Sequence, residues 1–129
     1  MEGDAVTPLY MPHPGHFICA MDCQFFLNTY VNGYIVSTVG EYVPGFVRGK
    51  SYGARAKAGF TTLGAGADSF YETMVFPARR AERKPEHMCC PWEASDFAGI
   101  ESARYATAVA ATKGHADMVE KYGLAGYLR

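Results

Sequence analysis

Residues 24–39 read Gln24-Phe25-Phe26-Leu27-Asn28-Thr29-Tyr30-Val31-Asn32-Gly33-Tyr34-Ile35-Val36-Ser37-Thr38-Val39, and this stretch decides the fold. Two runs rich in aromatic and β-branched residues flank the Asn32-Gly33 dipeptide. Such runs favour strands, and an Asn-Gly pair suits a two-residue turn in which both residues take positive φ. The stretch therefore predicts a β-hairpin whose second strand is ended by Gly40 and the Pro44-Gly45 pair.

One more strand is predicted downstream of the hairpin. Residues 45–69 are rich in glycine and read as a long loop, with room for a short strand at 59–63. Phe70–Phe76 is predicted to form a third strand, and Pro77 is expected to stop it. Residues 78–86 carry several charges and read as a linker.

The C-terminal third predicts a helix. Segment 96–122 is rich in alanine, Ser95 or Asp96 suits the N-cap, and Gly123 suits the end. Gly99 and Gly114 each cost about 1 kcal/mol relative to alanine, and either could divide the segment into two helices. Strands followed by a terminal helix indicate an α+β fold, with a small antiparallel sheet or partly open barrel covered by the helix.

Length and composition bound the class of protein. The 129 residues suit one domain, which we place at 16–129 behind an irregular proline-rich arm at 1–15. The chain lacks a run of about 18 apolar residues, so no membrane-spanning helix is predicted. Met1–Asp4 is acidic, unlike the start of a signal peptide, so we expect a cytoplasmic protein. In that reducing compartment, cysteines are free or metal-bound more often than paired in disulfides.

All four cysteines and three of the four histidines lie in two groups along the chain. The groups are His13, His16, Cys19 and Cys23, and then His87, Cys89 and Cys90. Zinc needs about four nitrogen or sulfur ligands, usually in pairs two to four residues apart. Adjacent cysteines rarely both bind one ion in a simple finger. The spacing therefore predicts a zinc site formed by Cys19, Cys23, His87 and Cys89, with His16 in reserve. Cysteines packed as small apolar side chains are the alternative.

The residue types along the chain also suit two other kinds of site. Basic residues interleaved with aromatic ones suit a nucleic-acid surface, since cations neutralise phosphates and aromatic rings stack on bases. The candidate residues are Arg48, Lys50, Arg55, Lys57, Arg79 and Arg80. Solvated loops are the alternative, and the net charge of −1 gives no overall attraction to nucleic acid. A small hydrolase using Cys23 or a metal-bound water is a third possibility.

Several segments together resemble a family of short proteins found in bacteriophage and prophage-like sequences. The resemblance rests on Pro14-Gly15-His16-Phe17, Cys23-Gln24-Phe25, 34–42, 71–76 and 111–115, and it spans most of 12–122. It implies an accessory protein that binds a protein or nucleic acid inside an infected bacterium, or a virion component that assembles from several copies. The family supplies no catalytic residues. Its members tend to carry more cysteines where this chain has His87-Met88-Cys89-Cys90.

Overall fold

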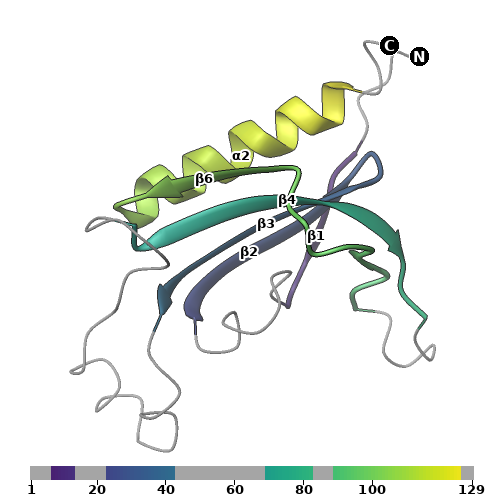
Figure 1. Ribbon diagram of the computed structural model, residues 1–129, viewed down its shortest axis with the longest axis horizontal. Coiled ribbons are helices and arrows are strands. Elements are labelled where there is room, and N and C mark those ends of the chain that lie inside the picture. Colours follow the sequence, from purple (N-terminus) through teal and green to yellow (C-terminus); the bar gives the residue numbers. More distant parts are fainter. Residues whose placement is uncertain (1–6, 14–22, 43–68, 83–88, 126–129) are drawn as a thin grey trace, which may run out of the picture.

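The computed structural model describes residues 7–13, 23–42, 69–82 and 89–125. These residues form an antiparallel sheet of six strands and one helix, which covers one face of the sheet (Figure 1). The elements are β1 (Leu9–Met11), β2 (Cys23–Val31), β3 (Tyr34–Tyr42), β4 (Tyr71–Arg80), β5 (Trp92–Ala94), β6 (Glu101–Tyr105) and α2 (Ala108–Ala125). The fold is α+β, a half-barrel with a C-terminal helix, as the sequence predicts.

The predicted hairpin is confirmed. Asn32 and Gly33 both have positive φ, 52° and 89°, and they join β2 to β3 with Val31 opposite Tyr34. The Asn32 side chain also donates a hydrogen bond of 3.1 Å to the backbone carbonyl of Tyr122, near the end of α2. The turn that sets the hairpin register is therefore also tied to the helix.

Gly40 lies inside β3, which continues to Tyr42, so the prediction that Gly40 ends the strand is wrong. The residue opposite it on β4 is Tyr71, whose ring occupies the space that a Cβ at Gly40 would need. Phe25 packs edge-on against the same ring, with the two centroids 5.1 Å apart. The glycine therefore makes room for an aromatic pair instead of breaking the strand.

Strand order is β1-β2-β3-β4, and the outer edge of β4 is shared by two short strands. β6 pairs with the first half of β4, and β5 pairs with its last three residues. The arm that we expected to be irregular contributes β1, which pairs with β2 through Met11 opposite Asn28. The predicted loop at 45–69 lies, apart from its last residue, outside the described residues.

Pro77 also lies within a strand, β4, which continues to Arg80; it neither stops the strand nor begins a linker. Its carbonyl accepts hydrogen bonds from the N–H and hydroxyl of Ser95, while the N–H of Ala78 donates to the carbonyl of Gly33. The N–H and C=O of one strand residue point to the same side. The donor that proline lacks would therefore face the segment between β5 and β6, and its absence costs no bond to β3.

The C-terminal segment is a strand followed by a helix, not one helix from residue 96. Burial alternates along β6, as expected for a strand, and α2 begins only at Ala108. Thr107 caps the helix, because its hydroxyl accepts a hydrogen bond of 3.1 Å from the N–H of Ala110. Gly114 does not divide the helix: the Tyr105 side chain lies where its Cβ would be. The helix continues past Gly123, the predicted end.

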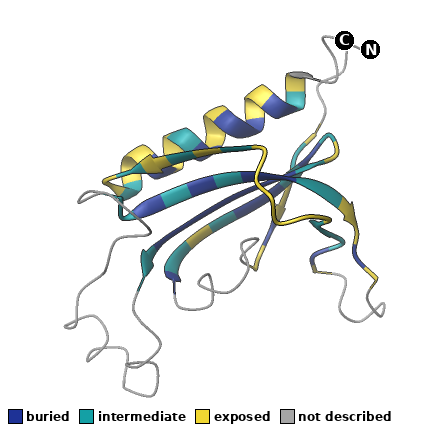
Figure 2. Cartoon of the chain, in the orientation of Figure 1, coloured by how far each residue is buried: buried dark blue, intermediate teal, exposed yellow. Residues whose placement is uncertain are grey.

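Buried residues lie along β2, β3 and β4 and recur along α2 (Figure 2). Each face of the sheet carries its own set of buried apolar side chains. On the helix side, Met118, Val119 and Tyr122 of α2 pack on Val31, Val36 and Val75 of the strands. The opposite side holds a second set, Met11, Ile35, Phe76 and Cys90. A sheet buried on both faces positions residues on either side of it rigidly.

One polar cluster lies within the helix-side core. The His115 side chain from α2 reaches the Thr29 hydroxyl through Nε2 at 2.8 Å and the Thr38 hydroxyl through Nδ1 at 2.7 Å. Thr38 also shares a hydrogen bond of 2.5 Å with Thr73. His115 is 3% exposed and the three threonines are fully buried. Burial lowers the pKa of His115 to about 4, because the charged imidazolium loses its hydration.

We expect His115 to make the protein sensitive to acid. The unfolded chain binds a proton at this side chain near pH 6.5, whereas the folded chain does so only near pH 4. Stability from the neutral imidazole is complete above pH 6.5 and falls as the pH drops towards 4, by about 3 kcal/mol in total. The free energy of unfolding, measured with urea at several pH values, should fall more steeply for the natural protein than for His115→Gln. Equal slopes in both proteins would contradict this prediction.

Candidate metal centre

A histidine and two cysteines meet where the segment after β1 approaches the segment before β5. The Nδ1 atom of His13 lies 3.4 Å from Sγ of Cys90 and 3.5 Å from Sγ of Cys89. The three ligand atoms all lie within 4.8 Å of one another. Imidazole nitrogen and thiolate sulfur are the ligands that borderline and soft metals prefer, so this group could hold a metal ion. We call these three residues the His13 cluster.

The buried member of the His13 cluster is part of the hydrophobic core. Cys90 is 6% exposed and packs with Met11, Ile35 and Phe76, whereas His13 and Cys89 are exposed. Next to Cys90, the carbonyl of Pro91 accepts a hydrogen bond of 2.8 Å from the N–H of Ala81, just after β4. The core and this hydrogen bond therefore hold the Cys90 thiol in position without a metal ion.

His13 is held from the other side, by β2. The side-chain amide of Asn28 donates a hydrogen bond of 2.8 Å to the backbone carbonyl of His13. Met11, two residues earlier, is opposite Asn28 in the sheet and packs in the same core as Cys90. The imidazole is therefore presented by a short strand whose place is set by β2.

The sheet is bridged at a second point near the His13 cluster. The rings of Tyr30 on β2 and Trp92 on β5 stack with their centroids 4.0 Å apart and their planes 8° from parallel. The guanidinium carbon of Arg80 lies 5.1 Å from the centre of the indole ring. A stack of this kind contributes about 1 kcal/mol beyond the area it buries. It holds β5 over β2, although β3 and β4 separate them in the sheet.

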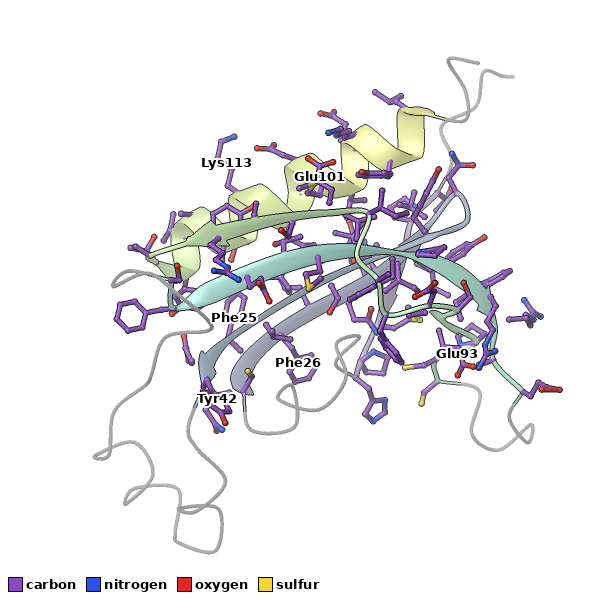
Figure 3. The ribbon with its side chains drawn as sticks, in the orientation of Figure 1. Phe25, Phe26, Tyr42, Glu93, Glu101 and Lys113 are labelled. Carbon is purple, nitrogen blue, oxygen red and sulfur yellow. The ribbon has the colours of Figure 1, made fainter. Side chains whose placement is uncertain are left out.

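The structure brings one predicted zinc ligand, Cys89, together with two residues outside the predicted four, His13 and Cys90. Cys23 lies elsewhere: it pairs with Tyr42 and packs against Val39. Figure 3 labels Tyr42 at one end of the sheet and Glu93, which lies on β5 three residues after Cys90, at the other. The remaining candidates, Cys19, His87 and the reserve ligand His16, lie outside the described residues.

His13 and Cys90 each had a signal in the sequence. His13 belongs to the same His-Cys group as His16 and Cys19, but its spacing from the nearest cysteine is long. Cys90 directly follows Cys89, and adjacent cysteines rarely both bind one ion. The two residues come together because the sheet curves, and the spacing of residues along the chain does not reveal that curvature.

Of the six basic residues predicted to bind nucleic acid, the described part of the chain includes Arg79 and Arg80. Arg79 forms an exposed ion pair of 2.8 Å with Glu93, and Arg80 lies over Trp92. Arg48, Lys50, Arg55 and Lys57 lie outside the described residues. The two arginines that can be placed thus already contact neighbouring side chains.

Comparison with known proteins leaves the site to be interpreted from its own geometry. No family model, curated protein or solved structure matches this chain. Among the described residues, no helix is long and apolar enough to cross a membrane. A function is therefore inferred from the arrangement of side chains at the His13 cluster.

The His13 cluster can be tested against the four ligands predicted from spacing. We expect His13→Ala to weaken cobalt(II) or zinc binding by more than about tenfold, since it removes a direct ligand. Cys23→Ala is the matched control: it alters a buried cysteine outside the cluster and should leave affinity unchanged. Affinities would be measured by competition with a chromophoric chelator. Loss of binding in Cys23→Ala with no loss in His13→Ala would favour the predicted four ligands instead.

Proposed function

We propose that this protein is a small α+β binding domain whose sheet is held closed by a structural zinc ion at His13, Cys89 and Cys90. The observation that carries the proposal is the spacing of the ligand atoms. Zinc bonds of roughly 2.0–2.1 Å to nitrogen and 2.3 Å to sulfur, at tetrahedral angles, separate the two atoms by about 3.5 Å. The two nitrogen–sulfur separations are 3.4 and 3.5 Å.

A structural role is supported by what the three ligands join. β1 and β5 stand at the two ends of the five-strand path through the sheet, and one ligand follows β1 while two precede β5. β1 has only three residues, and such a short strand is held weakly by its own pairing. An ion bound to His13 and both cysteines would close the gap between these ends and fix β1 in place.

The ligand count also favours a second candidate, a small metal-dependent hydrolase. Three protein ligands with an open fourth position are typical of catalytic zinc. Such enzymes also need a general base, and no carboxylate of the described residues joins the His13 cluster. Four glutamates are hydrogen-bonded elsewhere, Glu41 to Tyr71, Glu72 to Arg104, Glu93 to Arg79 and Glu101 to Lys121. The structural role is therefore the better supported.

Zinc should raise the thermal stability of the protein. An ion that binds only the folded chain, at a free concentration about 1,000 times its dissociation constant, stabilises by about 4 kcal/mol. For a domain of this size we expect the melting temperature to rise by roughly 10 °C or more. Elemental analysis of the purified protein should find about one zinc per chain. Protein that holds no zinc, with a melting temperature that zinc and chelators leave unchanged, would contradict the proposal.

The partner that we propose is a protein, consistent with a phage accessory role or a virion component. A pocket of about 330 Å³ lies between β1 and α2, with Tyr10 and Leu124 exposed at its walls and Glu120 among its lining residues. Apolar walls beside an exposed carboxylate suit an apolar side chain flanked by a lysine or arginine. Since His13 closely follows β1, a bound zinc ion would also steady one wall of this pocket.

Cross-linking from the pocket tests the choice of partner. A photoreactive residue at Tyr10 should give a defined protein adduct in bacterial cells, and Glu120→Lys should abolish that adduct by reversing the charge. The matched control is the same probe at Val109, which is 81% exposed near the other end of α2 and should give no such adduct. Identical adducts from both positions, or an adduct at Tyr10 that survives Glu120→Lys, would argue against this surface.

A further inference from the structure

Asn28 is a buried residue whose two side-chain polar atoms differ in their hydrogen bonding. It lies on β2 and is 6% exposed. Its Nδ2 donates to the carbonyl of His13 at 2.8 Å, whereas its Oδ1 is buried and has no hydrogen-bond partner among the residues that the structure describes. Buried acceptors are nearly always paired, because water lost on folding must be replaced. A buried acceptor without a partner in the described part of the chain can accept a hydrogen bond from a group bound beside it.

Asn28 lies on the side of the sheet that carries the His13 cluster. Directly opposite strand residues share a face, so Asn28 and Met11 lie on the same side. Met11 packs in the same core as Cys90. The backbone that Asn28 holds is that of His13, whose Nδ1 faces both thiols. Asn28 is thus hydrogen-bonded to His13 and lies opposite Met11, which packs in the same core as Cys90.

We propose that Asn28 is a positioning residue of the metal centre and that its free oxygen accepts a hydrogen bond from a water molecule in the fourth coordination position. This inference rests on the proposed zinc site. The hydrogen bond from the amide nitrogen of Asn28 holds the backbone of His13, whose Nδ1 lies 3.4 and 3.5 Å from the two thiol sulfur atoms. A metal-bound water is a strong hydrogen-bond donor, and the unpaired Oδ1 is an acceptor that suits it.

The proposal defines the chemistry of the site. Three protein ligands and one water leave a position at which a small ligand or a side chain of a partner can exchange. The ligand set around zinc would then be two sulfur atoms and two nitrogen or oxygen atoms. A site completed by a further cysteine would instead show three sulfur atoms.

Substitution of Asn28 separates positioning from general stability. Asn28→Ala should lower zinc affinity by about 10–100-fold in chelator competition, as losses of residues behind metal ligands do. It should also change the absorption spectrum of the cobalt(II)-substituted protein. Thermal melting of the metal-free protein should change little, since the substitution also removes an unpaired buried oxygen. Asn28→Ser, which keeps a small polar group, provides a second variant if the alanine variant folds poorly.

The matched control is Asn32→Gly. It removes another hydrogen bond from an asparagine amide to a backbone carbonyl, at the turn beside α2, and keeps a residue that tolerates positive φ. This variant should bind zinc with unchanged affinity. X-ray absorption at the zinc edge should find two sulfur ligands in the natural protein.

Three results would overturn the inference. Unchanged affinity and an unchanged cobalt spectrum in both Asn28 variants would remove the positioning role. Three sulfur ligands would remove the bound water. Equal loss of affinity in Asn32→Gly would make the effect a general one. In each case a natural protein that binds zinc leaves the proposed function standing, whereas a natural protein that binds no zinc defeats the proposed function itself.

Discussion

The turn at Asn32 and Gly33 sets the register on which both faces of the sheet depend. With Val31 opposite Tyr34, the odd-numbered residues of β2 and the even-numbered residues of β3 face α2. Thr29, Val36 and Thr38 are among them. The same register sends Asn28, Tyr30 and Ile35 to the opposite face, where the His13 cluster and Trp92 lie. A slip of one residue would exchange the two faces of β2. It would move the polar threonines away from His115 and separate Asn28 from His13.

The opposite face is closed by contacts between the ends of the sheet. Cys90 packs with Met11, Trp92 stacks on Tyr30, and His13 reaches both cysteines. The first two contacts are apolar and would hold without a metal. The third joins residues that could hold a metal ion, and His13 and Cys89 lie exposed on its solvent side. Ion binding would thus act on a junction that the core has already assembled in part, so the ligands lose less conformational freedom on binding.

Local sequence predicted the fold class and the hairpin, because Asn32-Gly33 and the aromatic and β-branched runs beside it act over a few residues. It failed where tertiary contacts override local preference. Pro77 is tolerated because its missing donor faces away from β3, and Gly114 remains helical because the ring of Tyr105 covers it. Of the two predicted ligands that the structure describes, Cys89 joins the His13 cluster and Cys23 does not. Residues 13 and 90 are far apart in the chain, and only the curvature of the sheet brings them together.

The hydroxyls around His115 form a chain with only two consistent directions. If Nδ1 carries the proton, it donates to Thr38, which donates to Thr73, while Thr29 donates to Nε2. If Nε2 carries the proton, every bond reverses. Sliding the helix by one turn would replace the imidazole with the side chain of Ala111 or Val119, neither of which can complete either arrangement. The chain of hydroxyls therefore specifies a single axial position for α2 on the sheet.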